Sequence, residues 1–116
     1  YEEALNYFFK LDFIESNCVK AWRGIGWCSF ISLKYEQAMK YYEKIIEQKP
    51  LAIDYMNAGH VAWVMGDIQK ASVFYGKAIT ASGNRERFLE MFHKDEEALL
   101  TQGIREEDIP LMLDLL

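Results

Sequence analysis

The stretch YEQAMKYYEKI, residues 35–45, decides the fold because the chain repeats it. Similar stretches begin at Tyr1 (YEEALNYFFKL) and at Ile68 (IQKASVFYGKA), so the three copies start 34 and 33 residues apart. In each copy an Ala stands three positions after the start, a pair of aromatic residues follows, and a Lys comes next. A repeat of this length is typical of stacked units that each contain two helices.

A second repeated segment precedes the second and third copies. Residues 19–33 (VKAWRGIGWCSFISL) and 52–66 (AIDYMNAGHVAWVMG) each contain an aromatic residue followed four positions later by a glycine. Two helices cross closely only where small side chains meet. We therefore expect Gly26 to face Ala38, and the corresponding glycine and alanine of the next copy to face each other. Large aromatic residues one turn away would fill the flanking space.

Together the two segments resemble the tetratricopeptide repeat, whose pattern is W-x2-L-G-x2-Y, then A-x3-F, then A and P. One copy matches this pattern at Trp22, Ile25, Gly26, Ala38, Tyr42, Ile45 and Pro50. The next copy matches it at Tyr55, Ala58, Gly59, Ala71, Tyr75 and Ala78. The chain departs from the pattern at Ser29, Ala62 and Gly83. The resemblance covers residues 1–82 and implies an all-α, right-handed superhelix of antiparallel helix pairs.

The repeat positions predict one domain with four parts. We expect a half repeat at 1–15, repeats at 18–50 and 51–83, and a helical cap at 84–116. The half repeat lacks its first helix, so we interpret the chain as part of a longer protein. In the alternative interpretation the protein starts here and another chain covers Phe8 and Leu11.

Local signals predict where the helices begin and end. Helices are expected at 1–14, 18–32, 35–48, 52–65, 68–81 and 85–102, the last with a break at 94–95. Asn17, Asp67 and Asp108 are expected N-caps, because short polar side chains accept hydrogen bonds from the first turn. Gly66 and Gly103 have the form of helix stops, since glycine adopts the left-handed conformation readily.

Charge and cysteine content restrict the function. All of the net charge of −5 comes from residues 85–116, which carry nine acidic and four basic residues. The chain has no basic stripe of the kind that binds nucleic acid, and no run of 18 apolar residues that would span a membrane. Cys18 and Cys28 lie roughly 15 Å apart on one predicted helix, too far to pair. Free thiols and the lack of a signal peptide favour a cytoplasmic protein.

Stacked helix pairs curve, so the first helix of each pair is expected to line a concave inner face. The resemblance implies that this face holds a peptide, as it usually does in the family. Residues spaced three, four, three and one apart share one side of a helix. The expected partner-binding residues are Lys20, Arg23, Trp27, Phe30, Ile31, Ile53, Met56, His60, Trp63 and Val64. Among them, Trp27, Phe30, Met56 and Trp63 would anchor an apolar or helical segment of a partner, as tryptophan-rich hot spots do.

Other interpretations of the same residues stay open. An aromatic stripe at helical spacing also fits a core that the chain's own terminal helices cover. Self-association through the first helix is a third interpretation. A family subgroup clamps terminal carboxylates with Lys and Asn, but only Asn57 matches that set, because Trp27 and Ile53 stand where Asn and Lys are required.

No constellation of catalytic residues is recognisable. His60 and His93 have no Cys or Ser at a spacing that indicates nucleophilic catalysis, and the chain has no metal-binding spacing or phosphate-binding loop. We therefore expect a non-catalytic module that binds a protein or peptide and needs no cofactor or metal. The alternative is a structural or self-association segment of a larger protein whose activity lies elsewhere.

Overall fold

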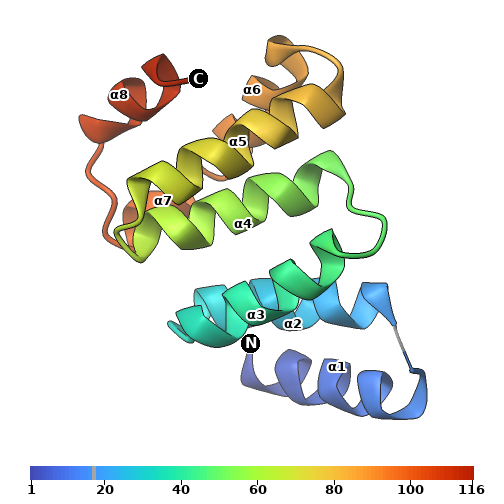
Figure 1. Ribbon diagram of the computed structural model, residues 1–116. Coiled ribbons are helices and arrows are strands. Elements are labelled where there is room, and N and C mark those ends of the chain that lie inside the picture. Colours follow the sequence, from blue (N-terminus) through green and yellow to red (C-terminus); the bar gives the residue numbers. More distant parts are fainter. Residues whose placement is uncertain (17) are drawn as a thin grey trace. The chain divides into compact units, whose positions relative to one another are not determined.

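The computed structural model describes residues 1–16 and 18–116, and their regular secondary structure is entirely helical (Figure 1). The helices are α1 (Glu2–Ile14), α2 (Val19–Ile31), α3 (Tyr35–Ile46), α4 (Ala52–Val64), α5 (Ile68–Ser82), α6 (Arg85–Lys94), α7 (Glu96–Thr101) and α8 (Asp108–Asp114). They form two compact units, Tyr1–Pro50 and Leu51–Leu116, which are described separately below. The predicted all-α fold of paired helices is confirmed.

In the first unit, α1 packs against α2 through a glycine. A Cβ atom on Gly24 would lie 2.4–2.5 Å from ring atoms of Phe8, so the ring occupies the space that any side chain at position 24 would need. Trp22 Nε1 donates a hydrogen bond of 2.8 Å to Asp12 Oδ1 across the same interface. Phe8 is therefore partnered within its own unit, and a second chain is not needed to cover it.

The α2–α3 pair is packed around a tyrosine ring. A Cβ atom on Gly26 would lie 2.9 Å from the Tyr42 ring, and Ala38 is fully buried. The expected close crossing is present, but the side chain that fills the space above Gly26 is Tyr42 rather than Ala38. Gln37 Nε2 donates to Ser29 Oγ at 2.8 Å, so the serine that departs from the repeat pattern joins the same two helices.

In the second unit, α4 and α5 repeat this arrangement. A Cβ atom on Gly59 would lie 2.7 Å from the Tyr75 ring, and Ala71 and Tyr75 are fully buried. The aromatic residue again contacts the glycine directly, because its ring reaches over the small side chain of the alanine one turn earlier. Asp67 caps α5 as predicted, since its Oδ1 accepts a hydrogen bond of 3.0 Å from Lys70 N.

The two helix-to-helix turns have the same backbone geometry but different residues. Gly66 has φ 90°, whereas the equivalent Leu33 has φ 68°, a left-handed conformation that leucine rarely adopts. In each turn the next residue donates a backbone hydrogen bond to the carbonyl group five positions before it. Lys34 N donates to Ser29 O at 2.8 Å, and Asp67 N donates to Ala62 O at 2.9 Å. Such bonds satisfy carbonyl groups at a helix end.

The C-terminal region forms three short helices. α6 and α7 are separated at Asp95, which confirms the predicted break, and Gly103 (φ 104°) ends α7 as expected. Ile104 N donates to Leu99 O at 3.0 Å, so the chain folds back after this stop. The prediction for Asp108 was wrong in detail, because Asp108 is the first residue of α8 and Glu107 is its N-cap.

Two predictions concern boundaries rather than packing. α2 has Cys18 as its N-cap, without a side-chain hydrogen bond. The predicted cap, Asn17, lies outside the described residues. The assignment of the whole chain to one domain stays a prediction, while the helix pairs α2–α3 and α4–α5 fall within the ranges expected for the two repeats.

Candidate functional site

The predicted partner-binding residues of α2 differ in their accessibility. Lys20 is exposed, and Arg23, Trp27 and Ile31 are half-buried, whereas Phe30 is fully buried. The four accessible residues follow one another at spacings of three, four and four, which places them on one side of the helix. We call this set the α2 face.

Phe30 is a core residue of the first unit rather than a contact on its surface. Its ring centroid lies 5.4 Å from that of Trp27 and 5.9 Å from that of Tyr35. Its predicted role as an anchor requires an exposed ring, so its complete burial contradicts that role. The position instead supports Trp27 from below and limits the orientations that the indole can adopt.

The predicted residues of α4 are mostly buried. Ile53 is exposed and Val64 is half-buried, but Met56, His60 and Trp63 lie in the interior. The expectation that Met56 and Trp63 offer exposed anchors therefore disagrees with their burial. These side chains instead fit the alternative interpretation, in which the aromatic stripe is a core that the chain's own helices cover.

The contacts of Trp63 show which helices cover the aromatic residues of α4. Its ring stacks on Phe92 of α6 with the planes 29° apart and the centroids 6.5 Å apart, and it meets Tyr75 of α5 edge-on at 6.3 Å. Phe88 and Phe92 are fully buried between the same helices. The helical cap thus supplies the aromatic side chains that complete the core of the second unit.

His60 lies at the centre of this aromatic cluster and bonds through both ring nitrogens. Nδ1 is 2.6 Å from Tyr75 Oη, and Nε2 is 3.0 Å from Asp95 Oδ2. An ionised carboxylate only accepts hydrogen bonds, so Nε2 carries the proton and donates it to Asp95. In the neutral imidazole Nδ1 is then an acceptor, and the Tyr75 hydroxyl donates to it. The histidine joins α4, α5 and the α6–α7 bend.

Burial determines the protonation of this group. Desolvation lowers the pKa of His60, although the hydrogen bond and the charge of Asp95 act in the opposite direction. Desolvation, with a smaller effect of Asp95, raises the pKa of Tyr75 well above its usual value. Both groups are neutral at pH 7, and the full burial of both rings keeps a substrate away from them. The arrangement is a hydrogen-bonded structural core.

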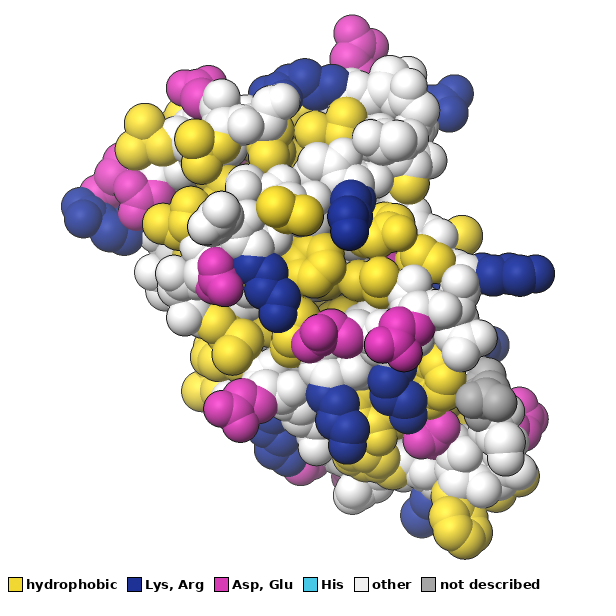
Figure 2. All heavy atoms as spheres, in the orientation of Figure 1, with side chains coloured by type: hydrophobic (Ala, Val, Ile, Leu, Met, Phe, Trp, Pro, Cys, Tyr) yellow, Lys and Arg dark blue, Asp and Glu magenta, His cyan; other side chains and the backbone are white. Residues whose placement is uncertain are grey.

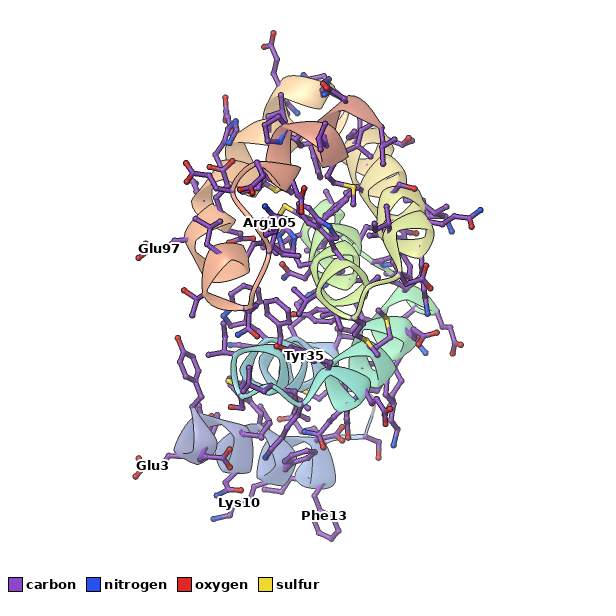
Figure 3. The ribbon with its side chains drawn as sticks, turned by 90° about the vertical axis from the view of Figure 1, so that its left-hand side faces the viewer. Glu3, Lys10, Phe13, Tyr35, Glu97 and Arg105 are labelled. Atoms are coloured by element: carbon purple, nitrogen blue, oxygen red, sulfur yellow. The ribbon has the colours of Figure 1, made fainter. Side chains whose placement is uncertain are left out.

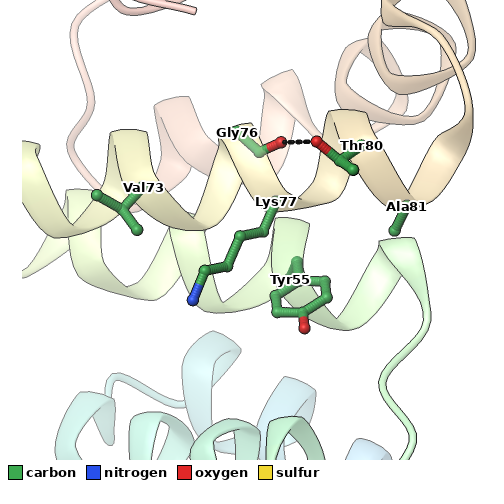
Figure 4. Close-up of a pocket in the computed structure, with 6 residues that line it drawn as sticks. All are labelled: Tyr55, Val73, Gly76, Lys77, Thr80 and Ala81. Carbon is green, nitrogen blue, oxygen red and sulfur yellow. Dashed lines mark hydrogen bonds between the residues drawn. The ribbon is translucent and has the colours of Figure 1, made fainter.

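One cavity was not anticipated from the sequence. Residues of α4 and α5 line a volume of about 490 Å³ (Figure 4). Its lining consists of Tyr55, Val73, Gly76, Lys77, Thr80 and Ala81. A Cβ atom on Gly76 would meet nothing within 4 Å, so this glycine opens the cavity and serves no helix crossing. The position of Gly76 outside the repeat pattern is a signal in the sequence that could have drawn attention to this cavity.

The outer surface of α1 is apolar at several positions. Phe13 is 92% exposed, and Tyr7 and Ile14 are also exposed. Figure 3 shows the Phe13 side chain directed away from the ribbon, as are Glu3 and Lys10 on the same helix. These residues were not among the predicted contacts, because the repeat pattern drew attention to Phe8 and Leu11.

One exposed pair of titratable side chains lies at the junction of α6 and α7. His93 Nδ1 lies 3.0 Å from Glu96 Oε1 at an exposed position of α6. Within residues 1–16 and 18–116, no three His, Cys, Asp or Glu side chains are placed so as to hold a metal ion. In the same part of the chain, no helix has the length and apolar character needed to cross a membrane.

Comparison with known families identifies the repeats. The family model for the tetratricopeptide repeat matches residues 20–50 and 55–85, together more than half of the chain. A search of curated proteins found no significant match. The matched ranges cover most of the α2–α3 and α4–α5 pairs, in each of which a tyrosine ring packs on a glycine of the facing helix. The chain belongs to the tetratricopeptide-repeat family.

Proposed function

We propose that the chain is a non-catalytic binding module that holds a partner segment on the α2 face. Tetratricopeptide repeats generally mediate protein–protein interaction, and they are typically not catalytic. The observation that carries the proposal is Trp27, a large aromatic side chain that stays partly accessible on a helix whose other aromatic residues are buried. Tryptophan is among the residues most often found at the energetic centre of an interface.

The surroundings of Trp27 define the partner. Ile31 extends the apolar surface one turn further, and Lys20 adds an exposed positive charge at the other end. The Phe30 ring behind Trp27 restricts its motion, so less side-chain entropy is lost on binding. The α2 face therefore suits a segment that combines apolar side chains with a carboxylate. Ile53 and Val64 stay candidate contacts in the second unit.

The test uses peptides selected on the intact chain from a random 12-residue library. Their dissociation constants are then measured by fluorescence anisotropy for the wild type and for Trp27→Ala. We expect the selected class to be apolar and acidic, and Trp27→Ala to weaken it at least about tenfold, which corresponds to about 1.4 kcal/mol. Lys20→Glu should weaken the same peptides more at low salt than at high salt.

Met65→Ala is the matched control, because Met65 is an exposed apolar residue on a turn of the second unit. It should leave the affinity of these peptides unchanged. Circular dichroism melting must show that Trp27→Ala unfolds near the wild-type temperature. If every acidic peptide binds Trp27→Ala and wild type equally, the α2 face is not the binding surface.

Self-association is a second candidate function, favoured by the exposed apolar side chains of α1. Tyr7 and Ile14 stand seven positions apart and so lie on one side of the helix, next to Phe13. Exposed apolar groups that lie close together mark protein contacts more often than isolated ones do. A second copy of the chain that packs along this side would bury them.

Sedimentation over a range of protein concentrations tests this candidate. Self-association predicts a mass that rises with concentration for the wild type and stays monomeric for Phe13→Asp combined with Ile14→Asp. Phe8 is unsuitable for this test because its ring packs on Gly24, so a polar side chain there would disturb the fold. A wild type that stays monomeric at every concentration excludes this role for α1.

A further inference from the structure

The second unit contains an open groove beside its last helix. The end of α4 and the start of α5 form one wall, and α8 forms the other, around a volume of about 470 Å³. This volume lies within the range of roughly 300–1,000 Å³ in which proteins hold ligands. The apolar lining consists of Trp63, Ile68, Leu111, Met112 and Leu115. We call this site the α8 groove.

The floor and the rim of the α8 groove have different exposure. Trp63 and Met112 are buried and form the floor. Ile68 is 53% exposed, and Leu111 and Leu115 are each 62% exposed, so the rim offers three large apolar side chains to a ligand. Figure 2 shows hydrophobic side chains at the surface over α8, beside acidic ones. Apolar groups gathered around a recess are a common feature of binding sites.

Two carboxylates stand at the ends of the same helix. Asp108 and Asp114 both line the groove, and they stand six positions apart, which corresponds to a rise of about 9 Å along the helix. Within the described part of the chain, neither forms an ion pair with a Lys or Arg side chain. The cation that reaches α8, Arg85, donates its hydrogen bond of 2.9 Å to the Leu113 carbonyl and not to these acids.

The wider region has the same sign of charge. Residues 85–116 carry nine acidic and four basic residues, and the whole net charge of the chain lies there. A negative surface repels nucleic acid and anionic lipid headgroups, and it attracts positively charged segments at a rate that falls with salt. Charge and shape together restrict the ligand to one that is apolar on one side and basic at its ends.

From these observations we infer that the α8 groove binds a short apolar segment of a protein partner that carries Lys or Arg at about the spacing of Asp108 and Asp114. The apolar side chains of the segment enter between Leu111, Leu115 and Ile68 and reach Met112. Its basic side chains pair with the two carboxylates. An amphipathic helix of two to three turns has these properties, with apolar residues at i, i+3 or i+4 and i+7. The site is independent of the α2 face and accepts the opposite charge.

The experiment uses the same random 12-residue library on the intact chain. The inference predicts a second selected class that is apolar and basic. Leu111→Ser should raise the dissociation constants of this class at least tenfold, and Val73→Ser, at a comparably exposed position of α5, should not. Trp27→Ala should leave the class unaffected, so this result is separable from the test of the α2 face.

The charge contribution is measured with Asp108→Asn combined with Asp114→Asn. This variant should bind the basic class three- to tenfold more weakly and should show a smaller dependence of affinity on salt. Glu90→Gln combined with Glu97→Gln, at exposed positions of α6 and α7, is the control with the same change of charge. The melting temperature, followed by circular dichroism, must be unchanged for every variant. For Leu111→Ser this is expected because Leu111 is mostly exposed.

Three outcomes overturn the inference. One is that the library yields no basic apolar class, or one that binds Leu111→Ser as tightly as the wild type. Another is that the two control variants weaken binding as much as the groove variants do. The third is a concentration-dependent mass in sedimentation that Leu111→Ser alone abolishes, since the occupant would then be a second copy of this chain.

Discussion

At the scale of single residues, Leu33 carries strain that its counterpart does not. It adopts φ 68° at the turn where the next repeat has Gly66 at φ 90°. The left-handed conformation costs an L-residue about 1–2 kcal/mol, and glycine avoids this cost. Glycine also loses more conformational entropy on folding than leucine does, which offsets part of the gain. Leu33 is 66% exposed, so little packing would be lost. We expect Leu33→Gly to stabilise the chain by about 0.5–1 kcal/mol.

Urea unfolding followed by circular dichroism measures this change. Leu33→Ala is the control, because it removes the same side chain and keeps the strained backbone, and it should not stabilise. Gly66→Ala should destabilise by about 1 kcal/mol for the reverse reason. If Leu33→Ala stabilises as much as Leu33→Gly, the gain comes from the exposed side chain and not from the backbone.

His60 makes stability depend on pH in a definite direction. Its pKa is lowered in the folded protein by desolvation, while in the unfolded chain it is about 6.5. Below about pH 6.5 the unfolded state therefore binds more protons, and the free energy of unfolding falls as the pH decreases from 8 towards the folded pKa. Asp95 and Tyr75 are the titratable groups that bond to the imidazole.

This dependence is measured by urea unfolding at pH 8, 7, 6 and 5. His60→Gln removes the titrating group and should reduce the loss of stability between pH 7 and 5, although it destabilises the protein at every pH. His93→Gln is the comparison variant, because it makes the same substitution at an exposed position. An identical profile for wild type and His60→Gln would exclude His60 as the source.

At the scale of helices, two glycines that look alike in the sequence have opposite roles. A Cβ atom at Gly24 would overlap the Phe8 ring at 2.4 Å, whereas one at Gly76 would meet nothing within 4 Å. Gly24→Ala should push α1 away from α2 and destabilise the first unit by about 1–3 kcal/mol. Gly76→Ala should stabilise α5 by about 1 kcal/mol, because alanine favours a helix.

Urea unfolding of the two variants, side by side, tests this pair. The substitution is chemically the same in both, so differences in the unfolded state largely cancel. Deuterium exchange should also show weaker protection of α1 backbone amides in Gly24→Ala and unchanged protection in Gly76→Ala. Equal effects of the two substitutions would show that packing does not distinguish these positions.

The helices themselves were largely predictable from local sequence. Their ends depend on signals such as Gly66 followed by Asp67, or the break before Asp95, which act within one or two turns of the chain. Their partners were less predictable. Gly26 and Gly59 were expected to face alanines, but tyrosine rings fill the space, because the direction of a side chain depends on both helices of a pair.

The candidate site was predicted less well for the same physical reason. Trp27 and Trp63 were both expected on the accessible face, although in the repeat Trp27 corresponds to His60 and Trp63 corresponds to Phe30. Phe92 stacks on Trp63 from 29 positions further along the chain, and no local pattern announces that contact. The α8 groove also combines residues from distant helices, so the sequence shows only its parts, the acidic composition of the C-terminal region and the mostly apolar stretch 109–116.

At the scale of the whole molecule, the second unit contains a complete core of its own. Trp63, Tyr75, Phe88, Phe92 and His60 contact one another, and all of them lie within Leu51–Leu116. We expect residues 51–116 expressed alone to be helical and to unfold cooperatively on heating. Phe92→Ala should destabilise this fragment by about 3–5 kcal/mol. Circular dichroism melting measures both, and a fragment without a melting transition would contradict the prediction.

The bond between His60 and Asp95 has a consequence for biosynthesis. The two residues are 35 positions apart, so the imidazole of α4 leaves the ribosome well before its carboxylate partner. At typical translation rates of about 5–20 residues per second, Nε2 of this ring lacks its carboxylate partner for seconds, whereas Tyr75 becomes available to Nδ1 earlier. The α1–α3 unit needs no later residue for the contacts described within it. The nascent chain should therefore acquire its structure in two steps, and the second step should be complete only after Asp95 has emerged.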